Sequence, residues 1–236
     1  LRHGTQRFRA EPARGLSLLL LLAVAVVIVP TLAAGLALPA AHHERALSDV
    51  AAVTLLAVYV LGTVGGLGGR HDEEGVPAGR GPRGEALPPA LVVLVGASVA
   101  AAFVSAWFVD AFQPAITALG ISETFAGLVI VAIAGNAVEN VVGVRLAGRN
   151  QTDLSLSVVL QSPLQIALVL IPVLVLVSPI LGGSLLTLVF PPLLVASLGL
   201  AAVVTAVVVM DGESTWMEGT ALVGLYAVIA AAFWWG

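Results

Sequence analysis

The sequence predicts an all-α integral membrane protein with seven transmembrane helices. Of its 236 residues, 59% are hydrophobic and only 10% are charged, whereas about a quarter of the residues of a soluble domain are charged. Long apolar runs recur along the chain, and each approaches the roughly 20 residues that a helix needs to cross a bilayer. The runs cover about residues 16–38, 47–67, 87–112, 123–147, 153–178, 186–210 and 215–235.

One linker divides these runs into two groups. Residues 68–86 collect glycine, proline, arginine and acidic residues, which is typical of a connection in water. We therefore expect two helices in residues 1–67, an acidic cytoplasmic linker at 68–86, and five helices in residues 87–236. Because the chain begins with Leu1 and not with methionine, we also expect that an N-terminal portion precedes it.

The arginines predict the orientation, because basic residues near the ends of spans stay on the cytoplasmic side. The chain has no lysine, and counting spans places every arginine except Arg45 on one side. These are Arg2, Arg7, Arg9, Arg14, Arg70, Arg80, Arg83, Arg145 and Arg149. We expect the N-terminal end of the chain in the cytoplasm and the C-terminus outside.

Several classes of function do not fit the composition. The absence of cysteine excludes disulfides and thiolate metal sites within the chain. The net charge of −4 is small and scattered over loops, so a nucleic-acid partner is not expected. No nucleophile with a paired base and no phosphate-binding loop can be found, so we expect neither an enzyme nor a cofactor.

The fourth span contains the main candidate site. Glu139 lies in the segment Gly-Asn-Ala-Val-Glu-Asn at residues 135–140, and a charged residue inside a membrane costs about 2.5 to 3.5 kcal/mol on insertion scales. Asn136, Glu139, Asn140 and Gly143 follow the spacing of one helix face. Gly135 and Gly143 would let another backbone approach or let the helix unwind.

The fifth span has a polar stripe of its own, in which Asp153, Ser157, Gln161 and Gln165 recur every four residues beside Ser162. Pro163 interrupts this stripe. Because proline lacks an N–H and crowds the preceding turn, we expect a break that frees the carbonyl of Val159, as in the broken helices where transporters expose oxygen atoms to cations.

These side chains predict a site for a hard cation. Carboxylate, amide, hydroxyl and carbonyl oxygens suit calcium better than zinc or copper, and Glu139, Asn136 and Gln165 are the expected ligands. An empty Glu139, shielded from water, would hold a proton that an arriving calcium ion displaces. In the third span, Ser105 and Asp110 give weaker support, because serines pack membrane helices routinely and Asp110 lies near the interface.

Four segments resemble the cation/proton exchangers of the CAX family, within the calcium/cation antiporter superfamily. Residues 135–140, G-N-A-V-E-N, resemble the family signature G-N-A-A-E-H. The segment at 121–127 resembles the family's segment just before that signature. The segment at 153–167 resembles the family's D-L-x-L-G-V-A-x-G-S-S-x-Q-I-A, and the segment at 211–219 resembles its D-G-E-S-N-W-x-E-G.

The resemblance implies a calcium:proton antiporter of eleven spans, in which two inverted repeats of five follow an N-terminal helix. Residues 87–236 would be the second repeat, and residues 1–67 the last two spans of the first. The remainder of the first repeat would be a partner outside this chain. Glu139 would be the carboxylate that exchanges calcium and protons, with Asn136, Ser162 and Gln165 lining the same site.

The chain departs from the family pattern at three places. Asn140 replaces the histidine of the signature, Gln161-Ser162-Pro163 replaces Gly-Ser-Ser, and Ala106 and Gln113 stand where acidic residues are expected in the third span. Asp110, one turn from Ala106, would restore a carboxylate.

Two alternatives remain open: another monovalent or divalent cation exchanger, and a relative that keeps the fold without transporting. The absence of lysine and the abundance of alanine, glycine and arginine indicate a GC-rich bacterial genome. We therefore expect a bacterial plasma membrane.

Overall fold

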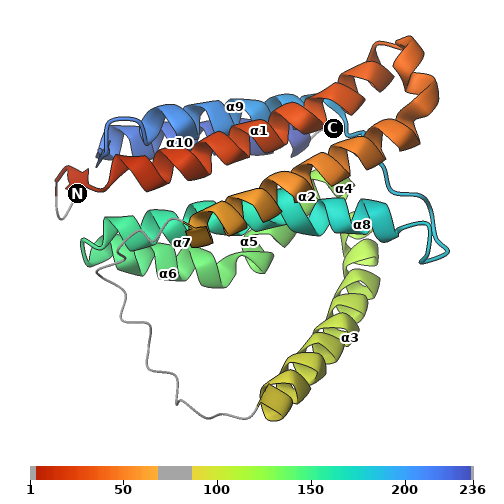
Figure 1. The fold of residues 1–236 in the computed structure, drawn as a ribbon, viewed down its shortest axis with the longest axis horizontal. Helices are drawn as coiled ribbons and strands as arrows, with labels where there is room; N and C mark the ends of the chain where they lie inside the picture. Colours follow the sequence, from red (N-terminus) through yellow and green to blue (C-terminus); the bar gives the residue numbers. More distant parts are fainter. Residues whose placement is uncertain (1–3, 69–86, 235–236) are drawn as a thin grey trace. The chain divides into compact units, whose positions relative to one another are not determined.

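The computed structural model describes residues 4–68 and 87–234, which are almost entirely helical (Figure 1). In chain order, the elements are β1 (Gln6–Arg7), α1 (Ala10–Gly35), the 3-10 helix η1 (Pro39–His43), α2 (Glu44–Gly68), α3 (Leu87–Leu119), α4 (Glu123–Phe125), the π-helix η2 (Ala126–Val131), α5 (Ala132–Gly135), α6 (Ala137–Gly148), α7 (Thr152–Gln165), the π-helix η3 (Ile166–Leu170), α8 (Ile171–Val177), α9 (Pro192–Val208), β2 (Glu213–Ser214) and α10 (Trp216–Trp234). The predicted linker lies outside the described residues, apart from Gly68.

Membrane-spanning length is reached by five described helical segments, at Ala10–Gly35, Pro39–Val64, Pro89–Leu119, Thr152–Val177 and Trp216–Trp234. A sixth span results if Glu123–Gly135 and Ala137–Gly148, bent by 60° at a break, are taken together. The helix α9 has 17 residues and is shorter than each of the five spanning segments.

The sixth apolar run is predicted from about residue 186, but the helix within it begins later. The helix α9 begins at Pro192, and Pro191 before it has an extended backbone with φ −52° and ψ 131°. Two consecutive prolines explain this boundary, because each removes a backbone donor and disfavours helical geometry in the residue before it.

The described chain divides into two compact units. Residues 1–65 and 133–229 belong to the first unit, and residues 66–132 and 230–236 belong to the second. In the second unit, the Ser122 hydroxyl accepts from the Phe125 N–H at 3.1 Å and donates to the Phe233 carbonyl at 2.5 Å. The ring of Phe125 meets that of Trp234 edge to face, with centroids 4.8 Å apart.

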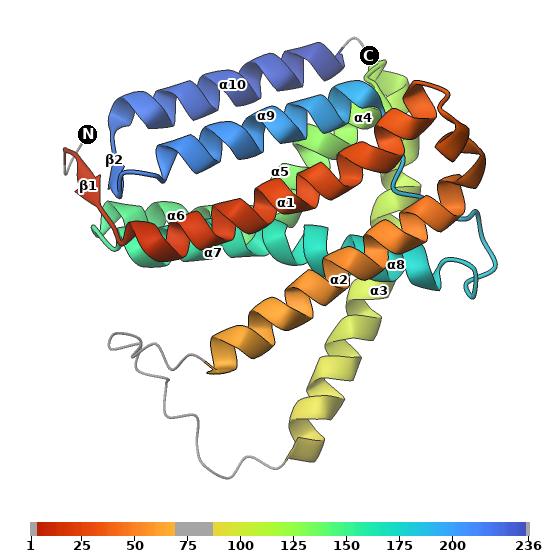
Figure 2. The same cartoon turned by 45° about the horizontal axis from the view of Figure 1, so that its top comes forward.

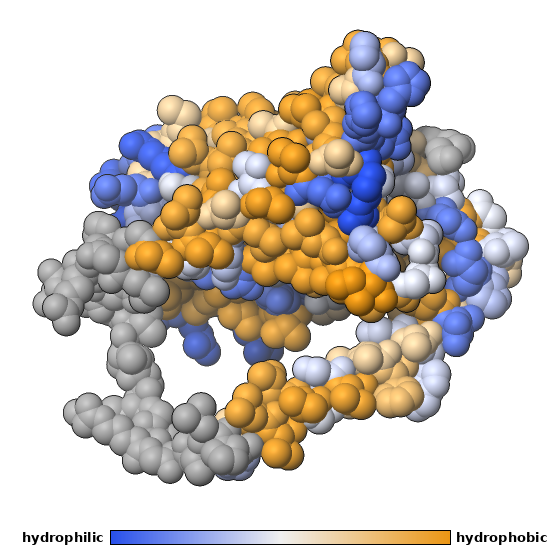
Figure 3. All heavy atoms as spheres, turned by 45° about the vertical axis from the view of Figure 1, so that its right-hand side comes forward, coloured by the Kyte–Doolittle hydropathy of each residue, from blue (hydrophilic) through white to orange (hydrophobic). Residues whose placement is uncertain are grey.

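The first unit is organised around α1, which packs against α9 and α7 (Figures 1 and 2). The buried residues of α1 are all small or compact, namely Ala13, Ser17, Ala23, Pro30, Thr31 and Ala33. Small residues let helix backbones approach closely, which is how helices associate without a hydrophobic driving force between them. Larger apolar residues such as Leu18 and Val29 are exposed, and apolar side chains cover most of the face in Figure 3.

One end of the first unit is held together by the N-terminal arm. Strand β1 pairs with β2, the Phe8 N–H donates to the Gly212 carbonyl at 2.9 Å, and the Gln6 side chain donates to the Ala147 carbonyl at 2.7 Å. Gly212 has φ +78°, and a Cβ there would lie 3.0 Å from the Phe8 oxygen, so this position requires glycine. Arg7, Arg9 and Arg14 therefore share this end with the last turn of α6, as the counting of spans predicts.

The segment Asp-Gly-Glu-Ser-Thr-Trp-Met-Glu-Gly at 211–219 has a structural role here. Asp211 accepts from the Glu213 N–H at 3.0 Å. Thr215 and Glu218 form a reciprocal capping box, in which the Thr215 N–H donates to the Glu218 carboxylate at 2.7 Å and the Glu218 N–H donates to the Thr215 hydroxyl at 3.4 Å. The motif thus joins the arm to the start of α10.

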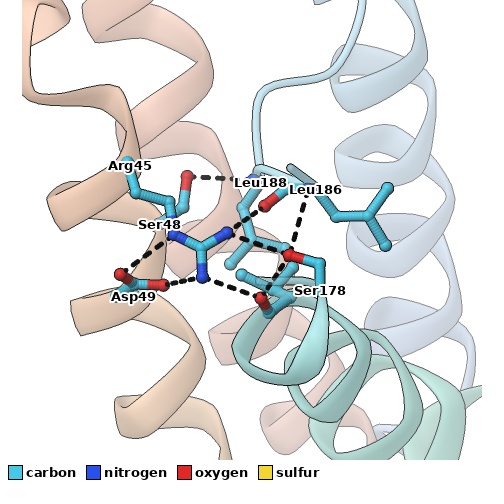
Figure 4. A network of polar contacts seen from close by, with 7 residues as sticks. Arg45, Ser48, Asp49, Ser178, Leu186 and Leu188 are labelled. Atoms are coloured by element: carbon cyan, nitrogen blue, oxygen red, sulfur yellow. Dashed lines mark hydrogen bonds and ion pairs between the residues drawn. The ribbon is translucent and has the colours of Figure 1, made fainter. Parts of the chain in front are cut away.

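The opposite end is held by Arg45 at the beginning of α2 (Figure 4). Its guanidinium forms an ion pair of 2.9 Å with Asp49, and it donates to the Ser178 hydroxyl, the Leu186 carbonyl and the Val175 carbonyl at 2.9 to 3.0 Å. Val175 belongs to the last turn of α8, whose carbonyls have no helical partner and attract a cation.

Two hydroxyls continue this anchoring of the extended segment before α9. The Leu188 N–H donates to Ser48 at 3.0 Å, and Thr31 contacts the Leu188 carbonyl and the Phe190 N–H at 3.3 Å each. Leu188 is fully buried among α1, α2, α7 and α8. Irregular backbone is tolerated in a membrane protein where the protein itself satisfies its polar groups, and these side chains do so.

Replacing Arg45 by lysine should lower the stability of the first unit. Lysine keeps the charge but cannot reproduce the planar fork that serves several acceptors. The Arg45 and Asp49 side chains are 28% and 38% exposed, so we expect a loss of about 2 kcal/mol, between the values for surface and buried pairs. Arg7→Lys is the matched control, because the Arg7 side chain, paired with Glu213, is 84% exposed. Thermal unfolding in detergent would test this, and equal midpoints for the two variants would contradict it.

Candidate functional site

The fourth span breaks at the candidate motif. Asn136 separates α5 from α6 with φ −101° and ψ 20°, and the two parts of the span differ in direction by 60°. The Asn136 carbonyl accepts from the Asn140 N–H at 2.9 Å and so begins α6, while its side chain caps nothing. Asn136 therefore keeps its amide oxygen for another partner.

The break places Glu139 in the first turn of α6. The unsatisfied N–H groups at a helix N-terminus attract a carboxylate, so this position favours an acidic residue despite the apolar surroundings. Glu139 and Asn136 are half-buried, and Asn140 is exposed. Asn140 thus lies beside Glu139 on α6, as the spacing predicts, whereas Asn136 precedes the helix.

The helices α6 and α7 pack side by side (Figure 2), and Gly143 lies at a close contact between them. The Ser155 hydroxyl donates to the Gly143 carbonyl at 2.8 Å. A Cβ on Gly143 would lie 2.8 Å from a methyl carbon of Val159 and 3.8 Å from the Ser155 oxygen. Gly143 thus lets side chains of α7 approach α6 closely, whereas a Cβ on Gly135, at the end of α5, would have open space.

This contact fixes which residues of the two helices lie at the same level. The helices run in opposite directions along the chain, so moving back from Gly143 on α6 corresponds to moving forward from Ser155 and Val159 on α7. Glu139 is then level with residues 159–163, which include Gln161 and Ser162. Asn136 is level with residues 162–166, which include Gln165.

The predicted break at Pro163 is wrong. The helix α7 continues through Pro163 to Gln165 and passes through η3 into α8, so residues 152–177 form a single span. The irregularity is a π-helical segment at Ile166–Leu170, just before Pro172 at the start of α8. A π-helical turn accommodates an extra residue without ending the helix and is frequent at functional sites, and η3 also contacts α1.

The polar stripe on α7 is divided between two roles. Asp153 accepts the Arg9 N–H at 2.7 Å, so it anchors the N-terminal arm at the end of the unit. Ser162 is half-buried, and Gln161 and Gln165 are exposed. These three remain available as oxygen donors.

Among the residues that the structure describes, Asn136, Glu139, Gln161, Ser162 and Gln165 make no side-chain hydrogen bond or ion pair. The described part of the chain also contains no cluster of three His, Cys, Asp or Glu residues that could hold a metal ion. A cation between α6 and α7 would therefore be bound by one carboxylate together with amide and hydroxyl oxygens.

The second unit contains the weaker candidates. Ser105 and Asp110 are both exposed on α3. The 121–127 segment begins α4 through Ser122, and Glu123 accepts from the Gln113 side chain at 2.7 Å. The sequence analysis did not predict the capping role of Ser122. A serine directly before the first residue of an apolar helix is nevertheless a common cap signal.

Comparison with known proteins supports the resemblance. A sequence model of the sodium/calcium exchanger protein family matches residues 89–235. The vacuolar calcium ion transporter of Schizosaccharomyces pombe is 32% identical over 242 residues, which cover 100% of this chain and 58% of the relative. The Ca2+/H+ antiporter ChaA of Bacillus subtilis is 36% identical over 149 residues, covering 61% of this chain and 41% of the relative.

A solved structure, that of native YfkE, is similar over 100% of this chain and 67% of its own, with a TM-score of 0.79 and 27% identity. The chain spans 58% of the length of the fission yeast relative. With the apolar helices, these matches identify an integral membrane protein and confirm the resemblance to calcium/proton exchangers.

Because Asn136 and Gln165 are expected at the same level of the two helices, a cross-link should form between these positions. Because the chain lacks cysteine, Asn136→Cys with Gln165→Cys introduces only these two thiols into it. We expect a short bis-alkylating reagent to join them, as measured by mass spectrometry of the linked peptides.

The control pair is Asn136→Cys with Leu154→Cys, which moves the second thiol by eleven residues, or about 16 Å along the helix. We expect little linkage in the control. Equal linkage in both pairs, or linkage only in the control, would contradict the assigned levels.

Proposed function

Because the chain belongs to the sodium/calcium exchanger protein family, we propose that the whole protein moves calcium across a membrane in exchange for protons. The proposal rests on the position of Glu139, which lies in the first turn of α6 beside a break in an apolar span, at the level of the oxygen-bearing side chains of α7. The relatives whose names specify calcium transport or calcium/proton antiport support the choice of ion.

The proposed exchange uses one carboxylate for both ions. In this scheme Glu139 carries the proton when calcium is absent. Calcium displaces that proton and binds the carboxylate with the oxygens of Asn136 and Gln165, and Ser162, Gln161 and Asn140 complete the surroundings. Return of a proton releases calcium on the other side, so the two ions occupy the site alternately.

We further propose seven spans for the chain, with α9 and its extended lead-in forming the sixth. Residues 87–236 then act as an inverted repeat that needs a first repeat as partner, because a midplane site between two repeats takes ligands from both. Ser105 and Asp110 on α3 are proposed to support the site. The arginine-rich end that includes the N-terminal arm is proposed to face the cytoplasm of a bacterial cell, with the C-terminus outside.

Replacement of Glu139 by glutamine should abolish calcium uptake. Glutamine keeps the shape and one oxygen but can neither release a proton nor neutralise the cation, so we expect at least a 100-fold lower rate, about 2.7 kcal/mol in barrier. The measurement is calcium uptake driven by a proton gradient in everted vesicles that contain the whole natural protein.

Glu11→Gln is the control, because Glu11 is an exposed carboxylate in the first turn of α1. Its uptake should equal that of the parent. Uptake by Glu139→Gln at the parent's rate would refute the assignment of Glu139.

A second variant distinguishes an active exchanger from a relative that does not transport. Asn140→His restores the residue of the CAX signature and adds a group that titrates near neutral pH. If Glu139 alone carries the proton, both forms transport, and the histidine form has a shifted dependence of calcium uptake on pH. Uptake only in the histidine form would favour the non-transporting alternative, and superimposable profiles would exclude position 140 from proton coupling.

A further inference from the structure

Gly143 lies at a close steric contact between the two site helices. A Cβ at position 143 would meet a methyl carbon of Val159 at 2.8 Å, closer than such carbon atoms come in folded proteins. Valine is branched at Cβ and has one strongly preferred rotamer in a helix, so this methyl group cannot simply turn aside. There is therefore no room for a side chain at position 143 beside Val159.

A hydrogen bond acts with this contact. Ser155, which is 9% exposed, donates to the Gly143 carbonyl at 2.8 Å. Ser155 and Val159 are one helical turn apart on α7, so both lie on the face that meets Gly143. The bond draws the two helices together and the methyl group limits how close they come.

The contact lies one turn from the proposed ligands. Glu139 precedes Gly143 by four residues, and Ser162 follows Val159 by three. A displacement of α6 from α7 at this point would move the carboxylate away from the oxygen atoms of α7 by a comparable distance. Calcium ligands lie at 2.3 to 2.6 Å from the ion, so a shift of even half an ångström would weaken binding.

We propose that Gly143 and Val159 are positioning residues for calcium exchange, and that their contact sets the distance between Glu139 and the α7 ligands. This inference rests on the proposed function. Neither side chain binds the ion. Their effect on transport is exerted through the separation of the helices.

The test is a double-mutant cycle in the whole protein, measured as calcium uptake against calcium concentration. In Gly143→Ala, the added methyl group should push the helices apart and raise the half-saturating calcium concentration about tenfold. Val159→Ala removes the methyl group that limits the approach of the helices, so alone it should also raise this concentration, by at least about threefold but less than Gly143→Ala, because Val159 is already 44% exposed. In the double variant the new methyl group fills the vacated space, and the concentration should return to within about threefold of the parent's.

Gly224→Ala is the matched control, because a Cβ there has open space. It should leave the half-saturating concentration unchanged. Thermal unfolding of every variant separates a general loss of stability from a change in the site. A double variant as impaired as Gly143→Ala, or a Gly143→Ala variant with the parent's calcium dependence, would overturn the proposal.

Cross-linking keeps the proposal distinct from the function on which it rests. In the Asn136→Cys, Gln165→Cys background, Gly143→Ala should lower the linkage yield, and adding Val159→Ala should restore it. If the parent protein took up no calcium, the proposed function would fail, yet this pattern of yields would still establish that the contact sets the spacing. A yield that does not respond to either substitution would overturn the steric argument itself.

Discussion

The structure depends on the cost of an unpaired polar group in hydrocarbon. Inside a bilayer no water is present to bond a free backbone or side-chain group, and each such group costs several kcal/mol. A continuous apolar helix avoids this cost, and most of α1 and α2 does so. Two departures from continuous helix in the first unit are bonded by other groups of the protein, whereas at the break at Asn136 the side chain caps nothing.

Two departures are fully compensated. The extended segment before α9 is bonded by Thr31 and Ser48 and by Arg45, whose guanidinium also serves the carbonyl end of α8. At the other end, the arm before α1 pairs with β2 and uses Asp153 as an acceptor. Both are anchors that join parts of the chain separated by more than a hundred residues. The break at Asn136 differs, because the side chains of Asn136 and Glu139 have no partner among the described residues.

The sequence predicted the positions of the apolar spans and of Glu139 because both depend on local composition. A carboxylate within an apolar run is conspicuous whatever its neighbours are. The consequences of the prolines were harder to predict: Pro163 is absorbed into a continuous span, whereas Pro191 and Pro192 displace the start of α9. A single proline is accommodated inside the span of α7, whereas two consecutive prolines stand where α9 begins.

The roles of Arg45 and Val159 could not be predicted from the sequence for a related reason. Arg45 has acceptors 130 to 141 residues away. The sequence alone therefore showed only that it is the one arginine on its predicted side of the membrane. Val159 is one of many apolar residues, and its importance lies in the position of its methyl group opposite Gly143. The spacing rule did predict the face of α6, because Glu139, Asn140 and Gly143 are governed by a single helix.

Glu139 is proposed to exchange a proton for calcium. This exchange can be followed as proton release on calcium binding, with the purified whole protein in weakly buffered detergent and a pH indicator. Calcium should acidify the solution with the parent protein, and Glu139→Gln should remove most of this release while leaving the smaller contribution of exposed acidic residues. Equal acidification by the parent and by Glu139→Gln would contradict the claim, because the exchanged proton would then reside on another group.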